Sequence, residues 1–297
     1  MKTTTITLQN TKSLLKPRPK DSHKGTYGTV NAVVGCARYR GAATLSVMGA
    51  LRSGAGIVRL CSTERVCSAV TVQYPSATLL PLPETAEGFI SMESVPKLLK
   101  NLKAEDTLLI GCGLGQCVDT SNTVNRIIFS TRCKKVVDAD ALNLIAPIET
   151  LGMIKNAKAL WGCVITPHIG EAARIMGRSI SSISENMETS ALEITKELGC
   201  VTVLKSHKTV IAVPDKETVY VGELGNTGLA RGGSGDVLAG LIAGVLAQGY
   251  TEEESALLGV TVHGTAADLC AKECSEHAML PSDLGTYICR AFKELDA

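Results

Sequence analysis

Short runs of β-branched and aliphatic residues recur along the chain, separated by longer stretches with helical spacing. Such runs predict buried strands, because β-branched side chains pack well on a pleated sheet. Strands are expected at residues 30–34, 57–60, 108–110, 136–137, 164–166 and 201–204. Helical patterns lie between several of these runs, at residues 42–54, 123–133 and 184–199. This alternation is typical of a mainly parallel sheet covered on both faces, so we expect a three-layer α/β/α domain.

The alternation breaks after Lys205, where two short β patterns follow each other directly. They occupy residues 207–214 and 217–224, and Pro214 and Asp215 between them predict a turn. We therefore expect a late antiparallel hairpin beside the parallel strands.

A long helix is predicted from Asp236 onward, because apolar residues recur there at helical spacing. Gly240 and Gly244 lie off the apolar stripe and would allow another element to pack closely. The longest apolar stretch covers residues 237–247, well below the roughly twenty residues that a membrane span needs. We therefore expect a buried helix and no membrane partner.

The chain contains neither a linker rich in Pro, Gly or Ser nor an internal repeat. Residues 1–297 are therefore expected to form a single domain, with residues 1–20 as a peripheral N-terminal segment. The first ten residues hold one Lys and no apolar run, so they lack the features of a secretory signal and are expected to fray.

Composition and charge narrow the classes of function. Hydrophobic residues make up 45% of the 297 residues and charged residues 20%, which excludes a disordered chain. The formal net charge of +1 is too small for nonspecific attraction to nucleic acid. Aromatic residues make up only 3%, which argues against stacking on single-stranded bases. We therefore expect no nucleic-acid partner.

The cysteines point to a reducing compartment. Eleven of them are scattered among apolar neighbours, without a CxxC pair, and no HExxH motif is present. This pattern argues against a disulfide framework and against a structural zinc site. We expect buried, reduced thiols in a cytoplasmic protein, and the sequence assigns no metal ligand.

The strongest local signal is the GGSGD run at residues 232–236, which begins the predicted apolar helix. Its glycines allow successive backbone N–H groups to point at one place, where the helix N-terminus adds positive potential. This pattern predicts an anion-binding turn, but not a Walker loop, because no GK[ST] follows. Asp236 is either an acid that caps the helix or a base that takes a proton from an attacking hydroxyl.

A second glycine cluster, Gly111, Gly113 and Gly115, follows a predicted strand and resembles the start of a dinucleotide-binding fingerprint. Gln116 stands where the third fingerprint glycine belongs, so an ordinary Rossmann site is not favoured. The glycines fit either a strand-to-helix turn or a close backbone approach to a ligand above the carboxyl ends of the strands.

Two further strand ends carry polar groups. His168 follows one strand and Glu171 lies in the next helical turn, where they are either loop and cap residues or ligand contacts. Asp138, Asp140 and Asn143 follow another strand, where acids either cap a helix or help to organise magnesium around phosphates. The residues alone leave both alternatives open.

Taken together, these segments resemble the ADP- or ATP-dependent NAD(P)H-hydrate dehydratases, a branch of the ribokinase-like superfamily. The matching segments include RGAATLSVMGALRSGAG, IGCGLG, VVDADALN, ITPHIGEA, VLKSHKT, NTGLARGGSGDVLAG and VHGTAADL, within about residues 23–270. The resemblance implies a ribokinase-like fold and a lyase that repairs metabolites by dehydrating the S form of hydrated NADH or NADPH. It also implies a nucleotide as phosphoryl donor, with ADP giving AMP and phosphate in the stand-alone bacterial members.

Carried over position by position, the resemblance implies roles for individual residues. Asp236 would be the catalytic base that faces the hydroxyl of the hydrated ring. The hydrated dinucleotide would also contact Ala42, Gly113 and His168. The nucleotide would contact Lys205, Ser206, His207, Lys208, Thr209, Asn226, Thr227, Gly233 and Gly235. Ser206 departs from the family pattern, which usually has glycine there.

The resemblance further implies Mg²⁺ as cofactor, a homo-oligomer such as a tetramer, and a separate NAD(P)H-hydrate epimerase as functional partner. Two other functions share some of these features. A kinase of thiazole or hydroxymethylpyrimidine alcohols would have the same fold and the same Gly-Asp element, but it would stop at the phosphate ester. A noncatalytic nucleotide sensor would bind nucleotide without turnover and would have no use for Asp236 beside an anion-binding turn.

Overall fold

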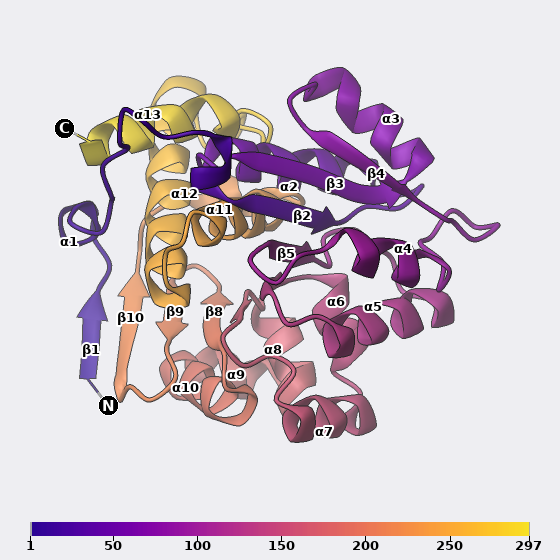
Figure 1. The fold of residues 1–297 in the computed structure, drawn as a ribbon. Coiled ribbons are helices and arrows are strands. Elements are labelled where there is room, and N and C mark those ends of the chain that lie inside the picture. The colour runs from indigo at the N-terminus through magenta and orange to yellow at the C-terminus, as the bar shows by residue number, and fades with distance from the viewer. Residues whose placement is uncertain (1, 297) are drawn as a thin grey trace.

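The computed structural model describes residues 2–296, which form one ten-stranded sheet with helices on both faces (Figure 1). The strand order is β1-β10-β9-β8-β7-β6-β5-β2-β3-β4. Neighbouring strands are parallel except in the pairs β8–β9 and β9–β10, so β9 runs opposite to the others. The mainly parallel three-layer fold with a late antiparallel hairpin is therefore confirmed, and each of the predicted strands is present.

The strands are β1 (Lys2–Thr5), β2 (Thr29–Val33), β3 (Ile57–Thr63), β4 (Thr78–Leu82), β5 (Thr107–Ile110), β6 (Lys134–Val137), β7 (Val164–Ile165), β8 (Val201–Lys205), β9 (Thr209–Ala212) and β10 (Thr218–Gly222). The α-helices are α1 (Leu8–Lys12), α2 (Arg40–Arg52), α3 (Glu64–Gln73), α4 (Ser94–Asn101), α5 (Val118–Ser130), α6 (Asp140–Ile145), α7 (Ile148–Ala157), α8 (Ile169–Met176), α9 (Ile180–Glu185), α10 (Met187–Leu198), α11 (Ser234–Ala247), α12 (Glu252–Cys274) and α13 (Leu284–Asp296). Two short 3₁₀ turns are η1 (Lys24–Tyr27) and η2 (Thr227–Leu229).

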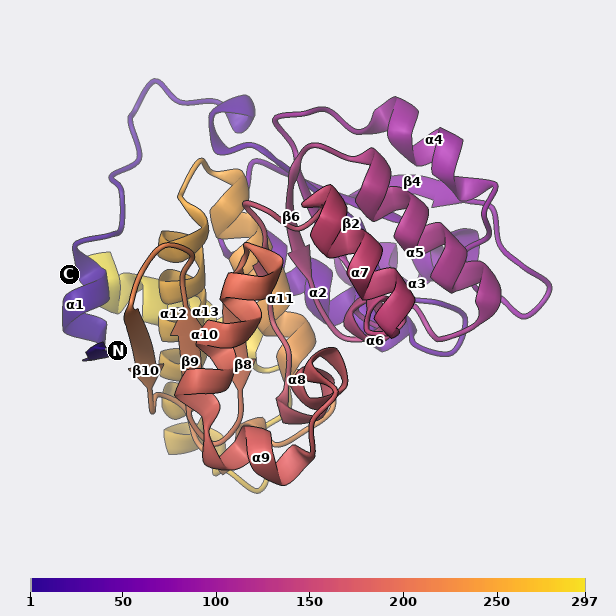
Figure 2. The ribbon, with the colours of Figure 1, turned by 90° about the horizontal axis from the view of Figure 1, so that it is seen from below.

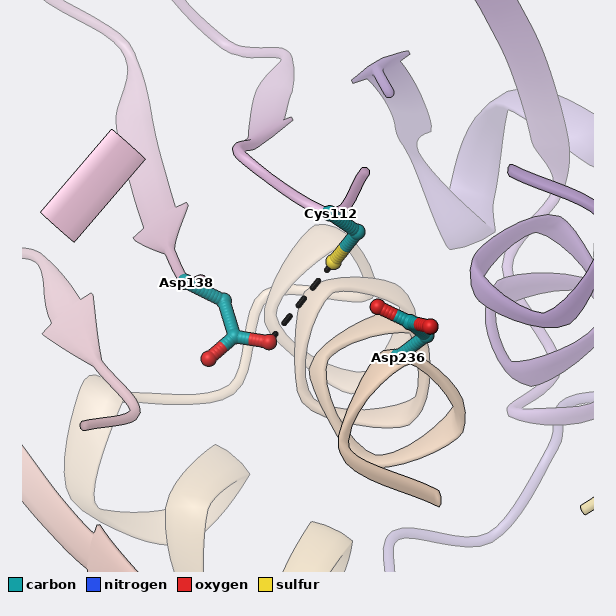
Figure 3. A group of neighbouring side chains, drawn as sticks. All are labelled: Cys112, Asp138 and Asp236. Carbon is teal, nitrogen blue, oxygen red and sulfur yellow. Dashed lines mark hydrogen bonds between the residues drawn. The ribbon is translucent and has the colours of Figure 1, made fainter. Parts of the chain in front are cut away.

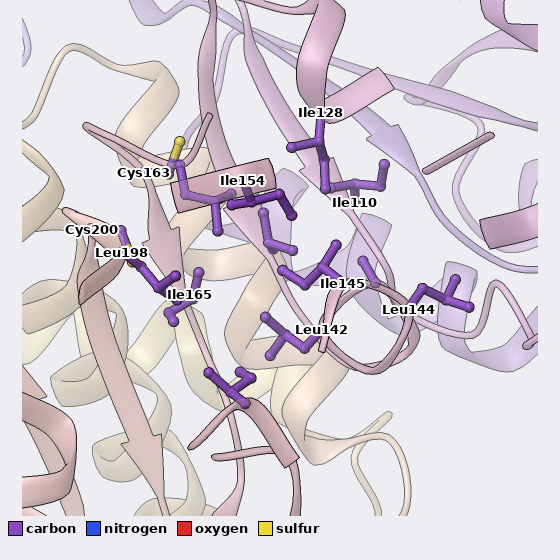
Figure 4. Packing of buried hydrophobic residues seen from close by; sticks show 14 of the residues in the cluster. Ile110, Ile128, Leu142, Leu144, Ile145, Ile154, Cys163, Ile165, Leu198 and Cys200 are labelled. Carbon is purple, nitrogen blue, oxygen red and sulfur yellow. The ribbon is translucent and has the colours of Figure 1, made fainter. Parts of the chain in front are cut away.

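Apolar side chains cover both faces of the sheet, as alternation along each strand requires. In β5, Leu108 and Ile110 pack with helices α4 to α10, whereas Leu109 packs with α2, α3, α11 and α12. Figure 4 shows Ile110 among side chains of α5, α6 and α7. Figure 2 shows α5, α7, α8 and α10 in front, with α2, α11 and α12 behind. Helix α13 packs outside this second layer.

The N-terminal segment is more ordered than the sequence suggests. Strand β1 pairs in parallel with β10, with Lys2 opposite Thr218, so the expectation of a frayed end is wrong for residues 2–5. The pairing gives partners to the backbone groups along the edge of β10, which would otherwise be open. Helix α1 follows, with Thr7 and Asn10 forming a capping box.

Helices α2 and α11 approach so closely that glycine is required at their contact. A Cβ atom on Gly240 would lie 2.1 Å from the Ser46 carbonyl oxygen, and one on Gly49 would lie 2.3 Å from the Val237 carbonyl oxygen. The expected close packing of the glycine-containing helix is therefore confirmed. It fixes the N-terminus of α11 at the carboxyl end of the sheet, where the candidate site lies.

Within residues 2–296, no helix combines the length and apolar character needed to cross a bilayer.

Candidate active site

The candidate site lies where β5, β6 and β8 end and α11 begins. Asp138 directly follows β6 and is buried, and Lys205 is the last residue of β8. Lys205 Nζ donates to Asp138 Oδ1 at 2.7 Å, and the two side chains are 19% and 2% exposed. This buried ion pair places one fixed cation and one fixed anion at the carboxyl ends of the strands.

Cys112 brings a third polar group to the same place (Figure 3). Its thiol donates to Asp138 Oδ2 at 3.7 Å, and its sulfur and one carboxylate oxygen each of Asp138 and Asp236 lie within 4.8 Å of one another. Burial, followed by repulsion from Asp236 and Asp138, raises the pKa of the Cys112 thiol well above its usual value. Cys112 is therefore a neutral hydrogen-bond donor between two carboxylates.

Local backbone geometry explains how Cys112 reaches this position. Gly111 and Gly113, on either side of it, have φ angles of 129° and 62°, which residues other than glycine rarely adopt. A Cβ atom on Gly111 would lie 1.8 Å from the Asp138 carbonyl oxygen. The second glycine cluster is thus a tight turn that brings the end of β5 against the end of β6. No sequence pattern indicated that Cys112 would join the site.

Asp236 is the third residue of α11 and follows Gly233, whose φ angle is 107°. Burial, followed by repulsion from Asp138, raises the pKa of Asp236 to about 7, although the nearby thiol of Cys112 and the charge of Lys205 oppose the shift. A carboxylate with such a pKa is half ionised near neutral pH and can both accept and release a proton. This ionisation behaviour makes Asp236 suitable as a general base.

Lys205 provides the positive charge that faces the anion-binding turn. A Cβ atom on Gly235 would lie 3.4 Å from Lys205 Nζ, so the turn at the start of α11 adjoins the ammonium group. Burial opposes the charge of Lys205, but the carboxylates of Asp138 and Glu171 outweigh it and raise the pKa above its usual value. Backbone N–H groups, the helix dipole and Lys205 together favour binding of an anion here.

His168 and Glu171 form the N-terminal cap of α8. His168 Nδ1 accepts from the Gly170 and Glu171 amides at 2.9 and 3.3 Å, and Glu171 Oε2 accepts from the His168 amide at 2.8 Å. Burial and the charge of Lys205 lower the pKa of His168, which favours the neutral imidazole. The backbone of His168 bridges to Lys205. The capping interpretation is thus confirmed, and a contact of His168 with the dinucleotide stays a prediction.

The predicted substrate residues Ala42 and Gly113 come together, because a Cβ atom on Gly113 would lie 2.6 Å from Ala42 Cβ. A cavity of about 230 Å³ lies nearby, lined by Arg38, Tyr39, Phe89, Gly115, Gln116 and Asp140. Asp140 accepts from the Gly115 amide and from Gln116 Nε2, each at 2.8 Å. In the structure Asp140 therefore holds the loop after β5.

A larger cavity of about 580 Å³ has Lys205 in its wall. Its walls include the predicted nucleotide residues Lys205, Ser206, His207, Thr209, Asn226, Thr227 and Gly235. Two other predicted residues are not among those that line it, since Lys208 Nζ pairs with Glu188 at 2.7 Å and Gly233 packs against Leu45. Apolar side chains of Leu224, Leu229, Ala230, Leu238 and Val260 also line it, together with the polar side chains of Arg231, Ser234 and His263. A cavity that combines charged and apolar side chains suits a phosphate joined to a base.

Ser206 fits the local backbone without strain. It lies in the turn between β8 and β9, where its amide donates to the Lys208 carbonyl at 3.0 Å. Its φ angle is not in the left-handed region that favours glycine. The absence of the family's usual glycine therefore leaves the backbone of this turn unperturbed.

Comparisons with known proteins agree with this geometry. The sequence profile of the NAD(P)H-hydrate dehydratase family matches residues 30–290. The ADP-dependent (S)-NAD(P)H-hydrate dehydratase of Neisseria meningitidis is 36% identical, over 86% of this chain and 81% of the relative. The chain spans about half the length, 53%, of two bifunctional NAD(P)H-hydrate repair enzymes, from Moorella thermoacetica and Thermofilum pendens.

Two solved structures share the whole fold. The ADP/ATP-dependent NAD(P)H-hydrate dehydratase of Bacillus subtilis, co-crystallised with ATP and Mg²⁺, superimposes with a TM-score of 0.80 at 28% identity, covering 98% of each chain. A ribokinase-like superfamily protein from Enterococcus faecalis has a TM-score of 0.83 at 25% identity, covering 99% of this chain and 96% of its own. The expected ribokinase-like fold is therefore confirmed.

Proposed function

The chain belongs to the NAD(P)H-hydrate dehydratase family, and from that premise we propose that it dehydrates the S form of hydrated NADH and NADPH at the expense of a nucleotide. The observation that carries this proposal is the position of Asp236, a carboxyl group with a pKa of about 7 beside an anion-binding turn and Lys205. The larger cavity includes Lys205 and Gly235 in its walls and would take the nucleotide, and the smaller cavity, lined by Gly115 and Asp140, would take part of the hydrated dinucleotide.

The reaction begins with activation of the ring hydroxyl. Asp236 takes the hydroxyl proton, and the oxygen attacks the terminal phosphorus of the nucleotide, forming one P–O bond while the bond to the leaving nucleotide breaks. Hydroxide is a poor leaving group, but once the phosphate ester has formed, inorganic phosphate leaves readily. The lone pair of the ring nitrogen assists cleavage of the C–O bond, and the neighbouring carbon loses a proton, which the released phosphate can accept, so that the dihydronicotinamide is restored.

Charge stabilisation supports the phosphoryl transfer. The positive end of the α11 dipole adjoins the place where the anion would develop, and Lys205, next to Gly235, adds a full positive charge. Asp138 holds Lys205 in place through the 2.7 Å ion pair. The chain therefore acts mainly by positioning and by electrostatics, and the thiol of Cys112 takes no covalent part.

The donor set fits magnesium that arrives with the nucleotide rather than a dedicated metal site. Asp138 is already paired with Lys205, both oxygens of Asp140 accept hydrogen bonds, and the thiol of Cys112 is a soft donor that Mg²⁺ does not favour. Magnesium bound with the nucleotide would neutralise phosphate charge, and Asp138 and Asp236 are the carboxylates that could help to hold it.

We further propose ADP as the preferred donor, giving AMP and phosphate. The similarity to the Neisseria enzyme, which is named as ADP-dependent, supports ADP. The Bacillus relative is named for both nucleotides, so ATP is the donor to compare.

The assay is absorbance at the dihydronicotinamide band after mixing protein, Mg²⁺ and S-hydrated NADH or NADPH with ADP or ATP in separate cuvettes. A nucleotide-dependent rise supports the proposal and ranks the donors. Asp236→Asn should lower the rate by at least about 10²-fold while nucleotide binding persists. Absence of any rise despite nucleotide binding would overturn the proposal and lead to a screen of alcohols for phosphate-ester formation.

Three further proposals concern the location of the protein, its oligomeric state and its partner enzyme. We propose a cytoplasmic enzyme, supported by eleven free cysteines that are mostly buried. It would act as a homo-oligomer such as a tetramer and alongside a separate NAD(P)H-hydrate epimerase. The bifunctional repair enzymes among the relatives support pairing with a second activity. Light scattering on the purified protein tests the oligomeric state.

A further inference from the structure

Residues 224–231 lead from β10 to the anion-binding turn and form one wall of the larger cavity. Their only regular element is the short turn η2. A binding wall with so little secondary structure needs partners outside the cavity to hold its shape. Helix α12 supplies the most direct of these partners.

The carboxylate of Asp268, in α12, holds two consecutive residues of this wall. Its Oδ2 accepts from the Gly225 amide and its Oδ1 accepts from Asn226 Nδ2, both at 3.1 Å. Asn226 in turn accepts from the Gly228 amide through Oδ1 at 3.0 Å, which caps η2. Asp268 therefore fixes which way the amide of Asn226 faces.

Close backbone packing reinforces this attachment one helical turn earlier. A Cβ atom on Gly264 would lie 2.6 Å from Leu224 Cβ, so the start of the wall lies directly on α12. Gly225 has a φ angle of 101°, and a Cβ atom there would lie 2.8 Å from Leu229 Cδ1. Gly264 and Asp268 are four residues apart and share one face of the helix.

The loop that follows α12 holds the outer side of the same wall. Glu276 Oε2 accepts from the amide of Thr227 at 3.2 Å and also from its hydroxyl. Arg231 donates to the carbonyl of His277. None of these contacts involves Lys205 or Asp236, so they shape the binding wall without entering the chemistry.

We propose that Asp268 is a positioning residue for nucleotide binding, acting through its hydrogen bonds to Gly225 and Asn226. This inference rests on the proposed use of the larger cavity by ADP or ATP. Loss of the carboxylate frees the wall to take many conformations, and the nucleotide must then order it on binding. The defect therefore lies in nucleotide affinity and not in the phosphoryl transfer.

The direction of the effect separates positioning from simple electrostatics. Removing a negative charge near an anion site would by itself strengthen the binding of a nucleotide. Loss of positioning has the opposite result. Weaker binding after neutralisation of Asp268 is thus a result that charge alone does not produce.

The experiment compares Asp268→Ala, which removes both acceptors, with Asp268→Asn, which keeps one carbonyl oxygen. We expect the KM and the calorimetric Kd for ADP to rise about tenfold or more in Asp268→Ala and by a smaller factor in Asp268→Asn, with kcat within about twofold. The matched control is Glu252→Gln, which neutralises a carboxylate at the other end of α12, where it pairs with Lys134 at 3.0 Å. This control should leave both constants unchanged.

Two further variants keep the inference testable. In an Asn226→Ala background, Asp268→Ala should have a several-fold smaller effect, because the partner of one hydrogen bond is already gone. If Asp268→Ala does not fold, Glu276→Gln weakens the outer attachment of the same wall and should raise the nucleotide KM in the same direction.

An unchanged or lower nucleotide KM in folded Asp268→Ala, beside a wild-type enzyme that turns over, would overturn this inference and leave the proposed function standing. A proportional fall in kcat with KM unchanged would also overturn it. A wild-type protein that binds neither ADP nor ATP would overturn both.

Discussion

Lys205 Nζ lies 2.7 Å from Asp138 Oδ1, and this buried ion pair joins the ends of β8 and β6 across β7. The two residues come from strands that are not neighbours in the sheet. A single buried charge would be costly at this position, and the pairing offsets that cost. Together they fix a cation beside the turn that begins α11. The pair is therefore expected to contribute both to the stability of the fold and to the binding of phosphate groups.

Lys205→Met should damage both properties at once. It leaves the Asp138 carboxylate buried without a cation, which should lower the free energy of unfolding by on the order of 3 kcal/mol. It also removes the charge that faces Gly235, so the KM for ADP should rise by at least tenfold. Urea unfolding and steady-state kinetics measure the two effects. Lys196→Met is the control, because Lys196 forms an exposed pair with Glu217, and it should change neither.

The pH dependence of catalysis should report the ionisation of Asp236. The base must be ionised to accept the hydroxyl proton, and its pKa is about 7. We therefore expect kcat/KM to rise about tenfold per pH unit below 7 and to level off above it. Glu171 also has a pKa raised to about 7, mainly by burial, so Glu171→Gln separates the two groups. In this variant kcat/KM should still fall below pH 7. If that fall disappeared, the ionisation would belong to Glu171 instead of Asp236.

Asp236 should also make the protein less stable as the pH rises. Its pKa is raised from 3.8 in the free group to about 7 in the fold, so the folded state binds more protons between these values. The resulting stabilisation is complete below about pH 4 and is lost as the pH rises through 7. Asp236→Asn removes this loss and should be more stable than wild type at pH 8, by no more than about 4 kcal/mol. The comparison is urea unfolding at pH 4 and pH 8, and a difference that is the same at both values would contradict the linkage.

The sequence predicted the parts of the fold whose residues carry a strong local pattern. The aliphatic runs that became β2, β5 and β8 are examples, and so is the helix after Asp236. Strand β4 was missed because Pro81 interrupts its pattern, which an edge strand tolerates. Strand β1 was missed because its residues, KTTT, are polar and acquire a role only by pairing with β10.

The site was predictable only in part, for a similar reason. Asp236 and the anion-binding turn are local features, so the sequence shows them directly. Cys112 looked like any other buried cysteine, and only the sheet order brings it between Asp138 and Asp236. Lys208 is the opposite case, a residue that the sequence places near the site but whose side chain lies elsewhere. It lies three residues from Lys205, yet its side chain pairs with Glu188 of α10. Chain connectivity places residues near a site, but the turn geometry decides which of them face it.

The departure of Ser206 from the family's glycine makes a final, sharper test of that geometry. The φ angle of Ser206 is not left-handed, and its amide closes the turn on the Lys208 carbonyl at 3.0 Å. Glycine gains no conformation that this turn needs, and it gives the unfolded chain more freedom. Ser206→Gly should therefore lower the free energy of unfolding by about 0.5–1 kcal/mol and leave the KM for ADP within about twofold. Calorimetry and kinetics on the same preparation decide the matter, because a several-fold gain in nucleotide affinity would mean that the turn rearranges around the bound phosphate.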